Sequence, residues 1–448
     1  MGLMQLIRRR GFQHGLHPPE HKELTEHRPI RRFPFAPMMI IPLSQHLGAP
    51  AVPIVREGQE VVRGEPIAKA GGFVSVPMHA PATGIISKID LAPNARGEKK
   101  PAIYLKLYAG ESQDILYGAP QHIDAMSSKE LIEAVQATGV VGLGGAAFPT
   151  HVKLALPEGK SVDTVIVNGC ECEPYLTTDH RVMMEWGAHI LDGIRIAMKA
   201  YNASRAIIGI EANKPDAAAN MRKIIGDTPD IEVLVLETKY PQGAEKMLIK
   251  AILGKEVPSG GLPYEVGTGI FNVATLAQIG ELLPKSQGLI ERVVTITGPG
   301  VSRPGNYLMA LGTPVRFALE QAGLKPEARE VILGGPMMGA AIADWDTPVT
   351  KGVTGLLVYT LNELRNRPTK VYPCIKCGEC VQVCPINLNP SQLGLLARVG
   401  QYEIMESDYH LNDCFECGCC TYVCPANIPL VQQFRVAKTI NRENKARI

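Results

Sequence analysis

The chain has 448 residues, which is too long for one ordinary hydrophobic core and predicts three or four domains. Its 46 basic and 44 acidic residues give a net charge of +2, so no global field points to nucleic acid or to an acidic polymer. No run of 18 or more apolar residues occurs, and residues 33–55, the best candidate, contain five prolines. We therefore expect no transmembrane segment, and any nucleotide must bind at a local site.

The N-terminus carries basic residues 8–10 after a short apolar stretch, which is the wrong order for a secretory signal. We therefore expect the protein to stay in the cytoplasm. Four histidines follow: His14, His17, His21 and His27. Their spacing matches no common zinc pattern, so a polar loop that docks against another domain is favoured over a metal site.

Residues 49–90 predict short β segments separated by glycine and proline. This stretch resembles the hairpin fold of biotinyl and lipoyl carrier domains. Such carriers have a lysine at the hairpin tip, about ten residues after the position of Gly64, and here that place falls near Val74. Only Lys69 is close, out of register, so we expect the fold without a swinging arm. The first domain is predicted over 1–120.

From about residue 121 to 285 helices and strands alternate. Residues 127–138 have helical periodicity and stop at Gly139, and residues 244–253 are helical before Gly254. Three segments are typical of strands: 162–167, 205–210 and 231–236. This alternation predicts a Rossmann-like α/β sheet that binds its ligands at the carboxyl ends of its strands.

A glycine-rich loop lies near the start of this domain, with the sequence Gly-Leu-Gly-Gly-Ala-Ala-Phe-Pro-Thr-His-Val-Lys over residues 142–153. Glycines allow backbone N–H groups to approach a phosphate closely, and Thr150 can cap a short helix whose N-terminus favours anions. Lys153 adds a positive charge. A plain turn is the alternative interpretation of the loop taken alone.

A second polar group follows the strand 162–167, in the sequence Asn-Gly-Cys-Glu-Cys-Glu-Pro. Carboxylates at the end of a strand can accept hydrogen bonds from ribose hydroxyls or from a nicotinamide amide, which nominates Glu171 and Glu173. Asn168 can hydrogen-bond the edge of a flavin ring. The isolated thiols Cys170 and Cys172 are too few ligands for a closed metal site, although a redox role stays open.

Residues 286–350 predict a small β-grasp module, with a helix near 315–322 and a strand at 330–333. A link containing threonine and glycine is expected near 350–365. A ferredoxin-like domain is then predicted over 365–440.

The eleven cysteines are clustered, with nine of them between residues 374 and 424, which indicates metal ligation rather than a disulfide framework. The spacing C-x2-C-x2-C-x3-C-P occurs twice, and in two-cluster ferredoxins the fourth cysteine of each run ligates the other cluster. The predicted ligand sets are Cys374, Cys377, Cys380 and Cys424 for one [4Fe-4S] cluster, and Cys414, Cys417, Cys420 and Cys384 for the other. Structural zinc is the alternative, but it has no use for the final x3-C-P. We expect the remaining Cys419 to be a small buried side chain.

Two clusters form a path for single electrons, whereas a hydride donor delivers two electrons together. Flavin is the usual group that splits the pair, so the upstream glycine loop is interpreted as a flavin site. The motifs at 142–153, 168–174, 243–246 and 272–275 resemble, in the same order, the flavin-binding subunit of respiratory complex I. The whole chain resembles more closely the RnfC family, including the opening His-Gly-Leu-His-Pro-Pro-Glu.

This resemblance implies a peripheral subunit, on the cytoplasmic face of the inner membrane, of an ion-translocating NADH:ferredoxin oxidoreductase. The subunit would take hydride from NADH onto non-covalent FMN and pass electrons through two [4Fe-4S] clusters. Implied partners are a ferredoxin-like iron–sulfur subunit and integral membrane subunits, with ferredoxin or flavodoxin as final acceptor and no nucleic acid. Residues implied to hold FMN are Gly142, Gly144, Gly145, Lys153, Asn168, Asn272 and Thr275. Phe148, Glu173 and Glu245 are implied to face NADH.

Hydride transfer itself requires no proton-transfer side chain, so no catalytic acid or base is expected. Two alternatives remain at this point. One is a cobalamin reductase of a bacterial microcompartment, which resembles this family. The other is a non-enzymatic adaptor that has lost flavin and only relays electrons.

Overall fold

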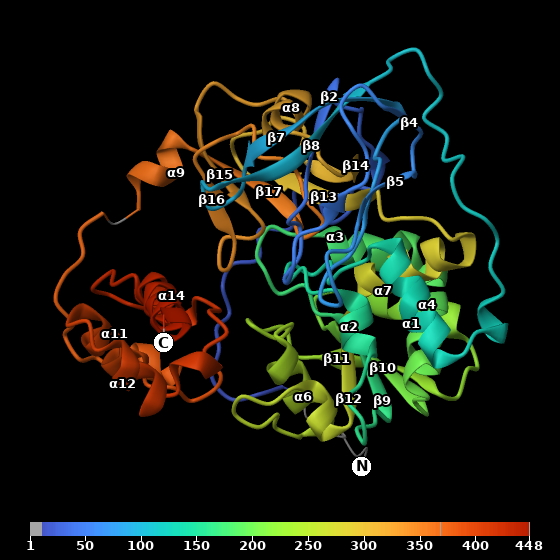
Figure 1. The fold of residues 1–448 in the computed structure, drawn as a ribbon. Coiled ribbons are helices and arrows are strands. Elements are labelled where there is room, and N and C mark those ends of the chain that lie inside the picture. The colour runs from blue at the N-terminus through green and yellow to red at the C-terminus, as the bar shows by residue number, and fades with distance from the viewer. Residues whose placement is uncertain (1–10, 368, 448) are drawn as a thin grey trace.

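The structure is a computed structural model that describes residues 11–367 and 369–447. Two β domains lie next to each other, an α/β domain packs beneath them, and a helical module stands to one side (Figure 1). The basic N-terminal stretch interpreted above, within residues 1–10, lies outside the described residues. Within the described part of the chain, no helix is both long enough and apolar enough to cross a membrane.

The first β domain consists of two antiparallel sheets that enclose one core. One sheet has the order β2-β8-β7-β4 and the other has the order β3-β5-β6. The strands are β2 (Met38–Pro42), β3 (Val52–Pro53), β4 (Glu60–Val61), β5 (Pro66–Lys69), β6 (Met78–His79), β7 (Gly84–Pro93) and β8 (Lys99–Leu107). Fully buried Met39, Ile67 and Ile103 fill the space between them. The predicted carrier-like fold is confirmed, and Val74 stands exposed where a carrier would have its lysine.

The α/β domain is built on a parallel sheet of order β11-β10-β9-β12. Its strands are β9 (Thr164–Gly169), β10 (Arg205–Glu211), β11 (Ile231–Leu236) and β12 (Thr268–Asn272). On β9, Val165 and Val167 join one hydrophobic core and Ile166 joins another. Helices therefore cover both faces of the sheet, which explains why the strands are nearly all apolar.

The helices of this domain begin and end at residues that the sequence marks clearly. The helices are α1 (Ser128–Thr138), α2 (Thr150–Leu154), α3 (Thr178–Glu185), α4 (Gly187–Tyr201), α5 (Pro215–Ile225), α6 (Glu245–Leu253) and α7 (Val273–Leu282). At the start of α1, Ser127 and Glu130 form a capping box, and Gly139 ends the helix with φ 70°. Gly254 ends α6 in the same left-handed conformation.

The β-grasp region forms a six-stranded sheet of order β1-β14-β13-β17-β15-β16. Its strands are β13 (Glu291–Thr297), β14 (Gly305–Ala310), β15 (Ala328–Leu333), β16 (Ala340–Ile342), β17 (Gly355–Thr360) and, from the N-terminal segment, β1 (Arg31–Arg32). Helix α8 (Val315–Gln321) packs against it. The expected link near 350–365 is wrong in part, because β17 is a fully buried strand inside the sheet. Its six residues are too short and too uniformly apolar to show a periodicity.

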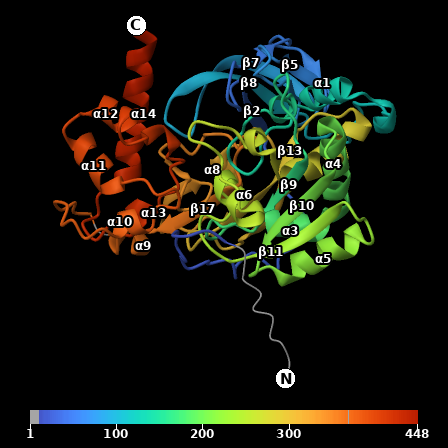
Figure 2. The same ribbon diagram turned by 90° about the horizontal axis from the view of Figure 1, so that it is seen from below.

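The cysteine-rich module is helical and follows α9 (Leu361–Arg365) after an extended connection (Figure 1). Its helices are α10 (Glu379–Gln382), α11 (Pro390–Arg398), α12 (Tyr402–Ser407), α13 (Cys419–Tyr422) and α14 (Leu430–Arg447). Leu393, Met405 and Phe434 are fully buried between them. Seen from below, the module keeps its place beside the other domains (Figure 2).

Candidate flavin and iron–sulfur sites

The carboxyl edge of the parallel sheet holds two asparagines side by side. Asn168 is the last residue but one of β9, Asn272 is the last residue of β12, and the two are register partners across the ladder. The chain runs from β9 outward to β10 and β11 and then returns to place β12 on the other side of β9. Open parallel sheets bind their ligands at such a switch point, in the crevice at the carboxyl ends of the strands.

The glycine loop is tied to this edge by the first turn of α7. The Asn272 side chain accepts hydrogen bonds from the backbone N–H groups of Ala274 (2.9 Å) and Thr275 (3.3 Å), which caps the helix. The Thr275 hydroxyl in turn accepts from the N–H of Leu143 at 2.9 Å. Gly144 packs on Asn272 so closely that an added Cβ would lie 3.2 Å from its Nδ2.

Buried Arg292 also holds the glycine loop in place. Its guanidinium donates to the carbonyl oxygen of Leu143 at 3.0 Å and also to that of Lys351. Burial lowers the pKa of Arg292 to about 10, and the carboxylate of Asp179 acts in the opposite direction. Sequence reasoning missed Arg292. Arg292 stands next to Glu291 at the start of β13, so its charge alone gave no signal of a buried role.

Lys153 reaches the same edge from α2. Its ammonium lies 2.6 Å from Oε2 of Glu245, at the start of α6, and 3.2 Å from the carbonyl oxygen of Ile270. Asn168 donates to the carbonyl oxygen of Gly243 at 2.8 Å, just before α6. The structure thus gathers the glycine loop, Lys153 and Asn168 around two helix N-termini, an environment suited to a phosphate-bearing ligand.

Two further observations test whether a flavin nucleotide fits here. Gly144 and Gly145 are exposed, so their backbone can approach a ligand closely, and Phe148 beside them is half-buried. The hydroxyl of Thr150 is buried without a hydrogen-bond partner among the described residues. Exposed glycines, an unsatisfied hydroxyl and a lysine form a donor set that fits a phosphorylated cofactor.

The cysteines of the helical module line two separate cavities. The outer cavity is lined by Cys374, Cys377, Cys380 and Cys424, of which Cys377 is exposed. The inner cavity is lined by Cys384, Cys414, Cys417 and Cys420, together with Cys419, and all but Cys414 are buried. Each cavity therefore combines three cysteines of one run with the fourth of the other, as the sequence predicted for the two ligand sets. Cys419 is fully buried, as expected.

The donor chemistry of both cavities fits a cubane cluster. A [4Fe-4S] cluster takes one thiolate on each of four irons, so its ligands stand apart around the cluster. Across residues 11–367 and 369–447, no three His, Cys, Asp or Glu side chains are grouped as they would be around a single ion.

Four family models match the sequence in this order: "RnfC Barrel sandwich hybrid domain" over residues 10–107, "Nuo51 FMN-binding domain" over 135–281, "SLBB domain" over 293–341 and "4Fe-4S dicluster domain" over 373–428. The chain is 42% identical to a subunit of the proton-translocating ferredoxin:NAD(+) oxidoreductase complex of Clostridium ljungdahlii, covering 97% of this chain and 94% of that one. The chain belongs to the RnfC family.

Two further relatives are similar to this chain over most of its length. A subunit of the Na(+)-translocating ferredoxin:NAD(+) oxidoreductase complex of Acetobacterium woodii is 41% identical, over 89% of each chain. A subunit of the ion-translocating oxidoreductase complex of Pseudomonas aeruginosa is 41% identical over 98% of this chain but only 56% of its own, longer chain. One chain of an NAD+-reducing [NiFe]-hydrogenase has a similar fold, with a TM-score of 0.50, 17% identity and coverage of 71% of this chain and 63% of that one.

The two glutamates nominated from their place after the strand 162–167, Glu171 and Glu173, are engaged in contacts within the protein. Both carboxylate oxygens of Glu171 accept backbone N–H groups at the start of α3, from Asp179 (2.9 Å) and His180 (3.3 Å). The carboxylate of Glu173 accepts from the N–H groups of Met337 (3.1 Å) and Met338 (2.8 Å) in the β-grasp domain. Their contacts with a nucleotide therefore stay a prediction.

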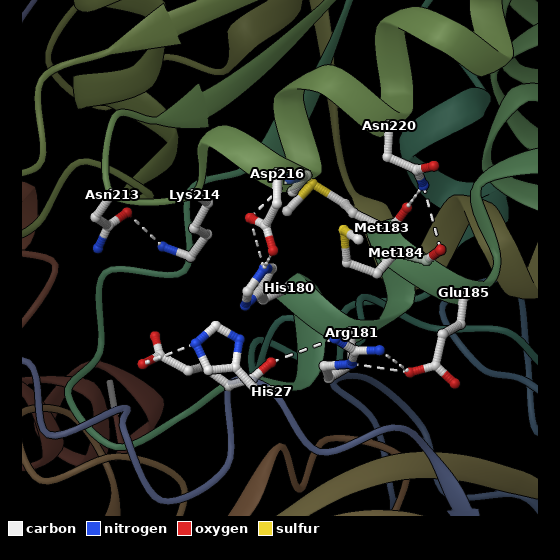
Figure 3. Close-up of polar contacts among 12 residues, drawn as sticks. His27, His180, Arg181, Met183, Met184, Glu185, Asn213, Lys214, Asp216 and Asn220 are labelled. Carbon is white, nitrogen blue, oxygen red and sulfur yellow. Dashed lines mark hydrogen bonds and ion pairs between the residues drawn. The ribbon is translucent and has the colours of Figure 1, made fainter.

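Cys170 and Cys172 lie in the loop that follows β9, near charged side chains that are themselves buried. Burial raises the pKa of both thiols. Nearby, Lys214 donates to Glu211 (3.0 Å) and Asn213 (2.9 Å). Figure 3 shows Lys214 reaching Asn213, and His180 facing Asp216 across the gap between α3 and α5. The His180–Asp216 pair joins α3 to α5 beside the predicted site, and Lys214 fixes the connection from β10 to α5.

The N-terminal histidine segment contacts both the α/β domain and the cysteine module. Leu16 and Tyr240 exchange backbone hydrogen bonds at 2.8 Å, and His21 stacks on Tyr175 with ring centroids 4.7 Å apart. The expected docking loop is confirmed.

Proposed function

We propose that this chain is the electron-input subunit of a membrane-bound, ion-translocating NADH:ferredoxin oxidoreductase. The observation that carries the proposal is the presence, on one chain, of an FMN-binding domain and a 4Fe-4S dicluster domain, with the glycine loop and the two four-cysteine cavities in the corresponding places. Relatives 41–42% identical are named as subunits of complexes of this kind.

FMN, when bound, can accept two electrons with a hydride and release them singly, while each [4Fe-4S] cluster carries one electron. In our proposal the amides of Gly144 and Gly145 and the ammonium of Lys153 bind the FMN phosphate without a covalent bond. The amide of Gly142 donates to the carbonyl oxygen of Phe148 at 2.8 Å, so Gly142 contributes by closing the turn of the loop. Asn272 and Thr275 hold the loop that presents these amides. Asn168 contacts the ring edge.

NADH is proposed to approach from the side of Phe148, Glu173 and Glu245, with Glu171 nearby. Positioning of the nicotinamide against the flavin supplies the rate, because hydride transfer needs no separate acid or base. The outer and inner cysteine sets hold one [4Fe-4S] cluster each, and the chain passes electrons to an iron–sulfur subunit of the complex. Ferredoxin or flavodoxin is the final acceptor. We place the chain on the cytoplasmic face of the inner membrane, attached through integral membrane subunits.

Anaerobic addition of NADH to the protein reconstituted with FMN, iron and sulfide tests this proposal. We expect the flavin absorbance to bleach, because hydride transfer from NADH reduces the flavin. Protein that holds FMN but keeps its oxidised spectrum in excess NADH would contradict the proposal.

The adaptor alternative is tested by replacing Lys153 with Ala. Loss of a hydrogen bond to a charged group costs about 1.5–3 kcal/mol, so FMN should bind roughly 10- to 100-fold more weakly, measured by flavin fluorescence titration. Exposed Lys160→Ala is the matched control. Unchanged flavin content and NADH oxidation in Lys153→Ala would favour an adaptor. The relatives reported above belong to ion-translocating complexes and give no support to a cobalamin reductase.

A further inference from the structure

The two cysteine cavities differ in how they are placed relative to the α/β domain. Tyr240, which is 1% exposed, donates its hydroxyl hydrogen to the carbonyl oxygen of Cys417 at 2.5 Å. Tyr240, Cys417 and Cys419 form one buried apolar cluster, and Cys172 packs against it. The inner cavity therefore adjoins the loops that follow β9 and β11.

Further contacts across this boundary also involve neighbours of inner-cavity ligands. Asp413, next to Cys414, accepts from the N–H of Gly260 at 3.1 Å and lies 3.5 Å from the ammonium of Lys246 on α6. Val383, next to Cys384, accepts from the N–H of Gly15 at 3.1 Å. Three of the four inner ligands are thus at, or next to, a contact with the rest of the molecule.

The outer cavity lies away from this boundary. Among the described residues, no hydrogen bond or ion pair joins residues 374–380 to the α/β domain. Apolar side chains around it are exposed, with Ile375 and Val399 each 68% accessible and Tyr372 48%. The cavity lining includes Lys376 and Arg398 but no aspartate or glutamate; the exposed Glu379, between Cys377 and Cys380, lies outside that lining. We call Tyr372, Ile375, Lys376, Arg398 and Val399 the outer face.

We infer that electrons pass between the flavin site and the inner cluster, then between the inner and outer clusters, and that the outer face docks an electron-carrier protein with an acidic rim around its own redox centre. The inference rests on the proposed function and adds the order of the clusters and the docking surface. Each step moves one electron from a reduced centre to an oxidised one, without a bond change. Two passages account for the two electrons of one hydride.

The charge of the outer face favours an acidic electron-carrier protein over a second copy of this chain, and the exposed Cys377 favours it over an anionic membrane. A second copy of the chain would bring Lys376 and Arg398 against themselves, which like-charge repulsion opposes. An anionic membrane would match the charge, but lipid over the exposed Cys377 would separate the outer cluster from any protein acceptor. An acidic carrier satisfies the charges, covers the apolar side chains and brings a redox centre close.

The test measures electron transfer from a photoreduced, acidic two-cluster ferredoxin to the oxidised holo-protein by anaerobic stopped-flow spectroscopy. Arg398→Glu and Val399→Glu lie at the end of α11, outside the cysteine runs, and iron content verifies that both clusters are intact. We expect each variant to lower the second-order rate constant about tenfold, because steering and docking are lost. Added salt should slow the wild type and not Arg398→Glu. Lys99→Glu and Leu116→Glu, exposed and in or after the first β domain, are the matched controls.

Rates equal to wild type in both variants would overturn the inference, as would equal slowing in the controls. Loss of binding to anionic phospholipid vesicles, with ferredoxin rates unchanged, would assign the outer face to a membrane instead and would also overturn it. Because the stopped-flow assay uses no NADH, its result does not depend on whether NADH bleaches the flavin. Failure of bleaching alone would remove the proposed function and leave the docking surface standing.

Discussion

Glu173 joins the α/β domain to the β-grasp domain at the scale of single residues. Its carboxylate accepts two backbone N–H groups from the loop between β15 and β16, and burial raises its pKa from 4.5 to about 7. Between pH 4.5 and 7 the folded protein keeps a proton on Glu173 that the unfolded chain has released. This group therefore makes the free energy of unfolding fall as the pH rises through that window.

Glu173→Gln should remove this titration while preserving the shape of the side chain. We expect the melting temperature of the variant to depend less on pH between 4.5 and 7 than that of the wild type, measured by circular dichroism without cofactors. Exposed Glu320→Gln on α8 is the control and should keep the wild-type profile. An unchanged slope in Glu173→Gln would show that another group is responsible.

Local sequence signals predicted the candidate flavin residues better than their partners. Glycines before a helix, and an asparagine at a strand end, carry their backbone requirements in the sequence itself. The structure brings Gly144, Asn168 and Asn272 to one edge. Arg292 and the capping role of Glu171 could not be predicted, because their partners lie far away in the sequence or depend on how α3 is oriented.

At the scale of elements, the α4–α7 pair positions the glycine loop. The helices cross with their backbones almost in contact: a Cβ added to Gly280 would lie 2.1 Å from the carbonyl oxygen of His189, and one added to Gly193 would lie 2.0 Å from that of Leu276. Because α7 begins with the Asn272 cap and Thr275, a displacement of α7 also displaces the loop bound to it.

Gly280→Ala should therefore destabilise the protein although alanine favours helix by about 1 kcal/mol. The clash with backbone atoms should dominate and cost about 1–3 kcal/mol, with weaker FMN binding, measured by urea unfolding and flavin titration. Ala188→Gly, at an exposed position of α4, is the control for helix propensity alone and should leave FMN affinity unchanged. A more stable Gly280→Ala protein would contradict the close crossing.

Element type was predictable where periodicity or end signals were strong. The strand predicted at 231–236 and the helix at 127–138 match β11 and α1 to within one residue. The strand β17 was mistaken for a link because a short apolar run has no periodicity of its own, and its role depends on β13 and β15 on either side.

At the scale of the whole molecule, the candidate flavin site lies in the α/β domain, the inner cysteine cavity adjoins that domain, and the outer cavity lies away from it. The pairing of the two cysteine runs was predictable from spacing, since each run supplies a ligand to the other. The orientation of the module was not, because contacts such as Tyr240 with Cys417 join residues far apart in the chain. The Tyr240 contact places the inner cavity next to the α/β domain, and the exposed Cys377 places the outer cavity at the surface. The proposed electron path therefore runs from the flavin site through the inner cavity to the outer one.

The most direct test of the central claim is formation of NADH by the isolated holo-protein from photoreduced ferredoxin and NAD+. This direction exercises the whole path from the clusters to the flavin. We predict NADH formation that requires FMN and is lost in Cys420→Ser, a change at the inner cavity, while flavin reduction by NADH persists in that variant. NADH formation at the wild-type rate in Cys420→Ser protein shown to lack the inner cluster, or none in the fully loaded wild type, would contradict the account.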